Sequence, residues 1–279
     1  MALSRAIETR KPAPGRICDD PLAEQFLSAP YRLLLLGRPL RDAIERVIER
    51  LFAGHHYYVI ARTRCFDDFL RERLEGKPEQ LVILGAGYDS RAHRFAGLLK
   101  GVAVFEVDHP ATSAAKQLQV RRALGAKAGA VTYVPVDFNT EKLAERLRNS
   151  GYRDGRKTVF LWEGVTPYLT ASAVDDTLAF ITSSSAPGSS LIFDYILSSV
   201  VDGSCTLHGA RNEFEKMQQT SEPLTFGIDE GQAVAFLSAR KFAGVRDIGA
   251  ADLKRKYFSG ASAARYVKPW WRIAQATVA

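Results

Sequence analysis

The chain is poor in the residues that build disulfide frameworks and metal centres. It has 3 cysteines and 5 histidines among 279 residues. The cysteines are odd in number, far apart and in no Cys-x-x-Cys pair, which argues against both a disulfide framework and a zinc site; they are Cys18, Cys65 and Cys205. The histidines show no His-x3-His or Glu-x2-His spacing on a helix, so we expect no metal.

Long apolar runs and an export signal are also missing. The leucine run from Leu33 to Leu36 is short and lies between Arg32 and Arg38, whereas a membrane-spanning helix needs about 20 apolar residues. The segment from Met1 to Arg10 lacks the apolar region of a signal peptide. We therefore expect a cytoplasmic protein with no membrane partner.

The formal net charge of +7 does not indicate nucleic acid binding. Basic residues are scattered along the expected helices and alternate with acids, which is typical of a solvated helix face; examples are Arg41, Asp42, Glu45, Arg46, Glu49 and Arg50. A basic balance also suits an anionic small molecule, through weak long-range steering. We expect a small-molecule partner.

The first 80 residues predict a mostly helical lead-in to a single domain. One amphipathic helix is expected over 41–52, because apolar residues recur there at intervals of three and four; these are Ile44, Val47, Ile48, Leu51 and Phe52. A second helix is expected over 57–74, with four residues pointing inward: Ile60, Phe66, Phe69 and Leu70.

Residues 81–196 alternate short β-branched runs with helical segments. Strands are expected at 81–84, 102–107, 131–136, 158–162 and 190–196, and the helices between them include 142–148 and 173–181. This alternation predicts an α/β fold with a parallel sheet, in which right-handed crossovers bring the functional loops to the carboxyl ends of the strands.

The pattern breaks at residues 197–230, which lack β-branched runs. An insertion at this edge of the sheet can act as a lid over a substrate, and a plain surface excursion is the alternative. The last segment, 231–279, predicts a helix over 232–242 and strands near 245–248 and 270–278.

A glycine turn follows the first expected strand. The run Leu81 to Leu84 leads into Gly85-Ala86-Gly87, and about 20 residues later the next strand ends in Glu106-Val107-Asp108. Such a turn lets backbone approach a ligand, and an acid ending the second strand can hold a ribose diol. Ser90 occupies the position at which a dinucleotide-binding fingerprint requires glycine or alanine, which weakens an NAD interpretation. A tight turn that binds nothing is the other alternative.

Three ordered motifs make the chain similar to the leucine carboxyl methyltransferase family of S-adenosylmethionine-dependent O-methyltransferases. They are Leu84 to Arg91, Phe105 to Pro110 and Leu161 to Leu169, within a resemblance that runs from about Arg5 to Phe242. Ser90 replaces the family's usual threonine and keeps the hydroxyl. The resemblance implies a Rossmann-like methyltransferase fold, with a mostly parallel seven-stranded sheet closed by a C-terminal antiparallel pair.

The same resemblance assigns a cofactor role to nine residues. Arg62 is expected to clamp the cofactor carboxylate, although spacing alone does not separate it from Arg64, and Arg5 is a second anion contact. Asp108 is expected to bind the ribose, with Glu106 on the same strand face as support or as structural filler. Asp137 and Phe138 are placed near adenine, with a helix cap as the alternative for Asp137. The full cofactor set is Arg62, Gly85, Ala86, Gly87, Glu106, Asp108, Asp137, Phe138 and Glu163.

The reaction implied is an in-line displacement at the sulfonium methyl. Tyr168 is expected to face the acceptor. A carboxylate acceptor is already ionised at neutral pH and needs no general base, whereas a hydroxyl needs one, for which His208 is the candidate. The absence of a clear catalytic dyad favours the carboxylate. A nicotinamide-dependent oxidoreductase and a non-catalytic binding module are the alternatives.

Overall fold

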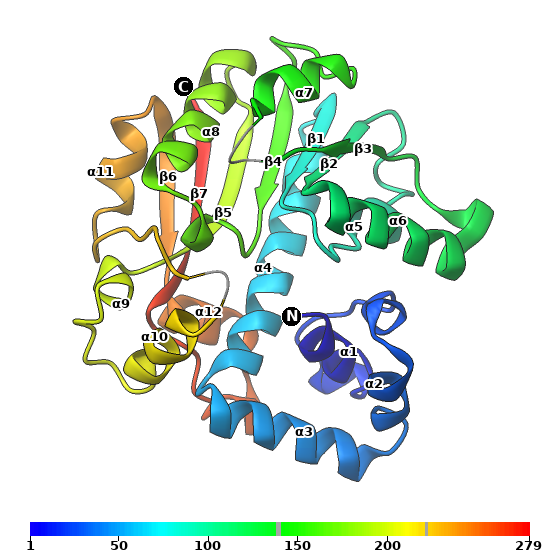
Figure 1. Cartoon of the computed structure of the whole chain (residues 1–279), viewed down its shortest axis with the longest axis vertical. Helices are drawn as coiled ribbons and strands as arrows, with labels where there is room; N and C mark the ends of the chain where they lie inside the picture. The colour runs from blue at the N-terminus through cyan, green and yellow to red at the C-terminus, as the bar shows by residue number, and fades with distance from the viewer. Residues whose placement is uncertain (138–140, 221–222) are drawn as a thin grey trace.

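The computed structural model describes residues 1–137, 141–220 and 223–279, which form an α/β structure around one seven-stranded sheet (Figure 1). The strand order is β3-β2-β1-β4-β5-β7-β6. Strands β1 to β5 run parallel, and β7 runs antiparallel to both β5 and β6. The strands are β1 Gln80–Leu84, β2 Ala103–Asp108, β3 Thr132–Pro135, β4 Thr158–Trp162, β5 Ser190–Ile196, β6 Phe242–Ile248 and β7 Trp271–Val278.

Helices surround this sheet, and three of them precede α4 in a separate N-terminal group (Figure 1). They are α1 Ala2–Thr9, α2 Ala29–Leu34, α3 Arg38–Leu51, α4 His55–Glu75, α5 Arg91–Arg94, α6 Pro110–Leu124, α7 Leu143–Asn149, α8 Ala171–Ser184, α9 Ser198–Val201, α10 Ala210–Gln218, α11 Ala233–Ser238 and α12 Ala250–Tyr257. None of the helices in the described ranges combines the length and the apolarity that crossing a bilayer requires.

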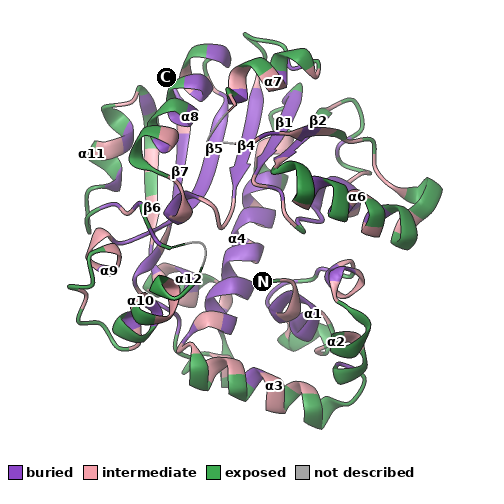
Figure 2. Ribbon diagram, viewed as in Figure 1, coloured by how far each residue is buried: buried purple, intermediate pink, exposed green. Residues whose placement is uncertain are grey.

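The parallel sheet confirms the five strands expected from the apolar runs, with ends that agree to within two residues. Every residue of β1, β4 and β5 is buried, as Figure 2 shows for the centre of the sheet. Strands covered on both faces have no solvent side, which is why these sequences are apolar almost without alternation. The strand order reverses between β2 and β4, on either side of β1, and a crevice opens at such a switch point.

Helix α4 carries the N-terminal group to the sheet. It confirms the helix expected over 57–74, and Ile60, Phe66, Phe69 and Leu70 are all buried as predicted. Its packing against β4 and β5 places the middle of the helix beside the carboxyl ends of those strands.

Helix α3 confirms the expected helix but corrects its expected buried face. Ile44 and Ile48 pack on a small separate core made by α1, the segment between α1 and α2, and Leu35 after α2. Val47 and Leu51, expected inward, are 55% and 48% exposed. Beside Ile44 and Ile48, the side of α3 that faces the protein carries the buried Glu45 in place of Val47 and Leu51. The apolar stripe is therefore wider than the surface against which α3 packs, and much of α3 is exposed (Figure 2).

The C-terminal strands form the expected antiparallel pair, although α12 lies in the connection between them. The helix expected over 232–242 is shorter, because α11 ends at Ser238 and the chain turns through Lys241, whose φ is 65°. Phe242 begins β6 and pairs with Val278.

Candidate functional site

The glycine turn lies at the carboxyl end of β1, at the switch point of the sheet. Gly85 and Gly87 have φ values of 61° and 42°, in the left-handed region that favours glycine. A Cβ on Gly85 would lie 2.2 Å from Cγ2 of Val165, which belongs to the loop after β4. Gly85 therefore lets the loops after β1 and β4 come together.

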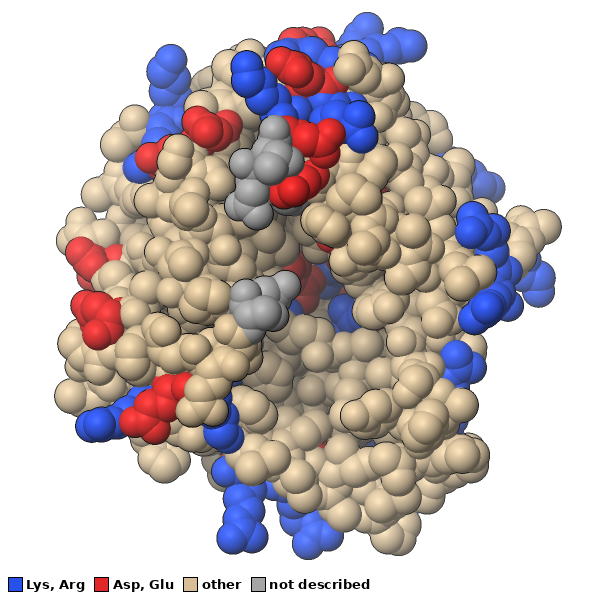
Figure 3. Space-filling view, viewed as in Figure 1, with Lys and Arg blue, Asp and Glu red and all other residues tan. Residues whose placement is uncertain are grey.

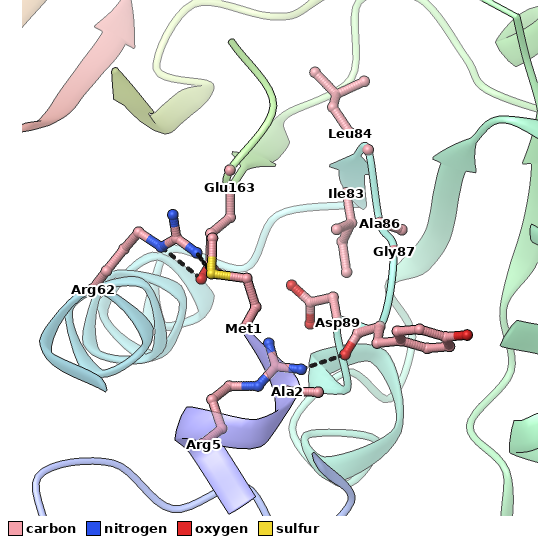
Figure 4. A pocket seen from close by; sticks show the side chains of 13 residues that line it. Met1, Ala2, Arg5, Arg62, Ile83, Leu84, Ala86, Gly87, Asp89 and Glu163 are labelled. Atoms are coloured by element: carbon pink, nitrogen blue, oxygen red, sulfur yellow. Dashed lines mark hydrogen bonds and ion pairs between the residues drawn. The ribbon is translucent and has the colours of Figure 1, made fainter. Parts of the chain in front are cut away.

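A cavity of about 240 Å³ lies beside this turn. Met1 and helix α1, through Ala2 and Arg5, line one part of it; α4 contributes Arg62, and the loop after β4 contributes Glu163 and Gly164. The rest of the lining is residues 83–89 of β1 and the turn. Figure 4 shows Arg62 and Glu163 on one side of the cavity and the glycine turn on the other. In Figure 3 charged groups lie at the bottom of a central hollow whose walls are mostly uncharged.

Arg62 is buried and points its guanidinium at the cavity (Figure 4). Nε donates to Oε1 of Glu163 at 2.9 Å, and Nη1 donates to Asp194 on β5. Nη2 faces the cavity, where it lies 3.2 Å from Sδ of Met1. Burial opposes the charge, yet the two carboxylates raise the pKa of Arg62 above its ordinary value. Nη2 is therefore the nitrogen that faces the cavity and can donate a hydrogen bond to a ligand carboxylate. The two ion pairs of Arg62 fix its orientation.

The structure separates Arg62 from Arg64, because the two residues lie on different sides of α4. Arg64 pairs with Asp68 on the same helix at 2.8 Å, with its side chain 44% exposed, and it does not line the cavity. Arg5 lines the cavity, and its Nη2 donates to the carbonyl oxygen of Tyr88 at 2.6 Å.

Glu163 lies between two arginines. Its second oxygen accepts a hydrogen bond from Arg91 at 2.6 Å, and Arg91 also contacts Asp89 and Asp67. Burial alone would raise the pKa of Glu163, but Arg91 and Arg62 hold it below its ordinary value. Asp89, paired with Arg91, has a pKa lowered to about 2 in spite of its burial. Both carboxylates are thus ionised and weakly basic.

Asp194 is a site residue that the sequence analysis missed. It is fully buried on β5 and accepts hydrogen bonds from Arg62, from Gly164 N–H at 2.5 Å and from the Tyr58 hydroxyl at 3.3 Å. Its signal was available, because a carboxylate within the apolar strand Ser190–Ile196 needs a partner, the same reasoning that singled out Glu163. Arg91 was missed as well.

Asp108 ends β2 beside the glycine turn and accepts hydrogen bonds from the N–H groups of Gly87 and His109. Neither Asp108 nor Glu106, which strand alternation places on the same face, is among the residues that line the cavity. The Glu106 carboxylate lies 2.7 Å from Nζ of Lys116 on α6, and both side chains are buried. Lys116 on α6 therefore engages the Glu106 carboxylate, and a role of Glu106 toward the cofactor stays a prediction.

Among the other expected residues that the structure describes, Asp137, Tyr168 and His208 are not in the cavity lining. Asp137 follows β3; its N–H donates to Glu141 at 2.9 Å, and Lys142, not Asp137, is the N-cap of α7. Phe138 lies outside the described residues. Tyr168 is half-buried in the turn after β4, packed against the main core. His208 is exposed, and its ring packs against that of Tyr266 with centroids 5.6 Å apart.

The described residues of the segment 197–230 contact the rest of the protein at several places. Glu213 on α10 pairs with Lys268 and accepts hydrogen bonds from Trp270 and Trp271 at 3.1 and 2.9 Å. Further along, Thr225 N–H donates to the carbonyl of Pro167 at 2.7 Å, next to Tyr168.

Comparisons with known proteins agree with this geometry. The sequence model of the leucine carboxyl methyltransferase family matches residues 1–182. A Frankia alni protein that is provisionally named an S-adenosyl-L-methionine-dependent methyltransferase is 36% identical over 197 residues, which cover 70% of this chain and 66% of that protein. The chain thus spans about two thirds of the length of the curated relatives it matches, with 66% and 67% for the first two.

Solved structures show the same fold. A Thermobifida fusca protein, provisionally called a methyltransferase, superposes with a TM-score of 0.60 at 14% identity, covering 86% of this chain and 88% of that one. The magnesium protoporphyrin IX methyltransferase of Synechocystis, solved with bound SAH, gives a TM-score of 0.50 at 11% identity over 85% and 94% of the two chains.

The strand order and the superposed structures define the class as the Rossmann-like fold of methyltransferases, which confirms the expected architecture. Within that class, the chain belongs to the leucine carboxyl methyltransferase family.

Proposed function

We propose that this chain is an S-adenosylmethionine-dependent O-methyltransferase whose acceptor is a carboxyl group of a small, polyketide-like or related metabolite. The observation that carries the proposal is the fixed Arg62–Glu163 pair opposite the glycine turn, at the switch point of a methyltransferase sheet. A hydroxyl acceptor is the alternative within the same reaction.

The residues present fit this cofactor. Nη2 of Arg62 and Arg5 offer donors to an amino acid carboxylate, and the glycine turn offers backbone within reach of it. Asp108 offers oxygens to a ribose diol. When bound, the cofactor supplies a methyl group on a sulfonium; the protein's contribution is to hold the acceptor in line with it, and such alignment is worth about 7–11 kcal/mol.

The low pKa values of the carboxylates that line the cavity favour a carboxylate acceptor. Glu163 and Asp89 are the carboxylates among the lining residues, and arginine contacts lower the pKa of each. A general base works best with a pKa near the working pH, so neither suits the deprotonation of a hydroxyl. An acceptor that is already ionised needs no base.

Methyl transfer from labelled S-adenosylmethionine to paired carboxylic acids and alcohols tests the proposal. We expect labelled products that release volatile methanol in alkali, as methyl esters do and methyl ethers do not. Alkali-stable products would contradict a carboxyl acceptor, and cofactor binding without any transfer would contradict an enzyme.

Two variants test the roles proposed for Tyr168 and His208 toward the acceptor. If Tyr168 faces the acceptor, Tyr168→Phe raises the KM for the acceptor and leaves the Kd for the cofactor unchanged. His208→Ala leaves kcat unchanged for a carboxylate, and a large loss of kcat would instead assign His208 as the base for a hydroxyl.

A further inference from the structure

Exposed apolar side chains concentrate on α2 and α3, at an outer corner of the molecule (Figure 2). Among the described residues, 7 of the 14 large apolar side chains that are exposed lie in this short part of the chain, each with an exposed fraction between 36% and 66%. These residues, the α2–α3 surface, are Tyr31, Leu33, Leu34, Leu36, Leu40, Val47 and Leu51. Single exposed apolar residues are ordinary, whereas a concentrated group marks an interaction surface.

Three of these side chains form a stripe along the outer side of α3. Leu40, Val47 and Leu51 follow one another at intervals of seven and four residues, which places them on one side of a helix. Ile44 and Ile48 lie beside this stripe and turn toward the small separate core of the N-terminal group. The packing of α3 on the protein therefore leaves the stripe exposed to solvent.

Cations border this stripe, and the acids of α3 turn away from it. Arg46 and Arg50 are exposed, and each directly precedes a residue of the stripe, about 100° around the helix. In the part of the chain that the structure describes, no carboxylate lies within 4 Å of either guanidinium. Glu45 and Glu49 instead accept hydrogen bonds from residues at the start of α4, and Asp42 pairs with a third arginine. Figure 3 shows basic side chains along the lower edge of the molecule, below α3.

An apolar stripe with a cationic border complements an anionic lipid surface. In a bilayer interface the apolar side chains enter the acyl boundary, while the arginines reach the anionic headgroups. A symmetric contact between two copies of the chain would instead bring the same arginines toward one another, and like charges at an interface are unfavourable. The absence of a membrane-spanning run, from which we expected no membrane partner, does not bear on a helix that lies in the plane of the interface.

We propose that the α2–α3 surface docks the protein on anionic lipid bilayers, with its apolar side chains in the interface and with Arg46 and Arg50 at the headgroups. Helix α3 has 14 residues and is about 21 Å long, so it lies along the bilayer and does not cross it. None of the seven residues lines the cavity beside the glycine turn. The inference therefore goes beyond methyl transfer and does not depend on the acceptor.

Sedimentation of the full chain with lipid vesicles tests the proposal. We expect the protein to sediment with vesicles of equal parts phosphatidylcholine and phosphatidylglycerol, and much less with phosphatidylcholine alone. Added salt should weaken this binding, because exposed charges are screened over about 10 Å at about 0.1 M salt. Binding to neither kind of vesicle, or equal binding to both, would contradict the proposal.

A double variant, Leu36→Gln with Val47→Gln, tests the apolar part of the surface. We expect its affinity for the phosphatidylglycerol vesicles to fall about tenfold or more, because two apolar side chains no longer leave water. Leu98→Gln with Leu118→Gln is the matched control, since both are exposed leucines outside the α2–α3 surface. All four positions are exposed, so thermal unfolding should be unchanged. Equal losses of affinity in the two double variants would overturn the proposal.

A second double variant, Arg46→Gln with Arg50→Gln, tests the cationic border. We expect affinity for the same vesicles to fall about fivefold for each arginine removed. Arg121→Gln with Arg122→Gln removes two exposed arginines from α6 and gives the same net charge, so it should bind nearly as the wild type does. An equal loss in this control would mean that the total charge attracts the chain and that the α2–α3 surface does not dock it.

Analytical ultracentrifugation separates lipid docking from self-association. The proposal is supported if the wild type is monomeric without lipid and binds the phosphatidylglycerol vesicles. A dimer that dissociates in the variant Leu36→Gln with Val47→Gln, together with no binding to these vesicles, would overturn the proposal and assign the surface to a second copy of the chain.

Discussion

Asp108 accepts a hydrogen bond from the backbone N–H of Gly87, so the end of β2 is tied to the turn after β1. The same carboxylate accepts from His109 N–H at 2.7 Å. Burial raises the pKa of Asp108 above its ordinary value, although both N–H groups oppose the shift. The acid that is expected to hold the ribose is therefore oriented by the turn that is expected to meet the rest of the cofactor.

Asp108→Ala is expected to weaken cofactor binding about tenfold or more, because hydrogen bonds to a charged group contribute about 1.5–3 kcal/mol each. The fold should persist, since Asp108 lies at the open edge of the sheet. Calorimetry gives the Kd, and Asp175→Ala, on the exposed side of α8, serves as the control. Unchanged affinity would place the ribose elsewhere.

Gly85→Ala is expected to destabilise the protein by about 2–5 kcal/mol, because left-handed backbone and overpacking against Val165 add together. Gly101→Ala is the matched control, with φ of 83° and nothing within 4 Å of the added Cβ, so only about 1–2 kcal/mol is expected. Urea unfolding measures both. Equal losses would mean that the Val165 contact imposes no strain.

Glu213→Gln is expected to cost about 3–5 kcal/mol, because it leaves the buried ammonium of Lys268 without its counter-charge. Glu215→Gln, on the same helix, breaks a solvent-exposed pair with Arg211 and should change stability by less than about 1 kcal/mol. A small effect of Glu213→Gln in urea unfolding would show that α10 is held mainly by other contacts.

The Glu106 carboxyl predicts a distinct pH dependence of stability. Burial raises its pKa to about 7 from an ordinary value of 4.5. Between these values the folded protein holds a proton that the unfolded chain has released, so this group's contribution to stability falls as pH rises from 4.5 to 7, by about 3 kcal/mol at most. The contribution of His93 to stability changes in the opposite direction and rises with pH, because burial lowers the pKa of His93 to about 4.

Comparison with Glu106→Gln isolates this contribution from that of His93. The stability of the wild type relative to the variant should decline between pH 5 and pH 7.5 in urea unfolding. The exposed Glu145→Gln should show no such trend. A parallel pair of curves for wild type and Glu106→Gln would contradict the assigned pKa.

The order of elements could be read from the sequence because it depends on local pattern. Short, fully apolar, β-branched runs such as Val159 to Trp162 are typical of central strands, and Gly85 and Gly87 have the left-handed conformation that other residues avoid. The ends of elements were less certain, and Phe242 was assigned to the wrong one because a helix and a strand can both bury a phenylalanine.

The side-chain contacts of the site required the tertiary structure. Glu106 and Asp108 share a strand face. Only the position of α6 shows that Lys116 pairs with Glu106, whereas Asp108 contacts the glycine turn. The apolar strand around Asp194 indicated that its carboxylate needs a partner, but only the fold shows that this partner is Arg62, 132 residues away.

The sequence by itself determined the fold class, the glycine turn and the family, since each depends on residues near one another in the chain. The tertiary structure decided that Arg62 shares its donors between Glu163 and Asp194, and that Glu163 lies between Arg62 and Arg91. The physical reason is that electrostatic interactions depend on distance in space, and β4, β5 and α4 bring these groups together only when the sheet has formed.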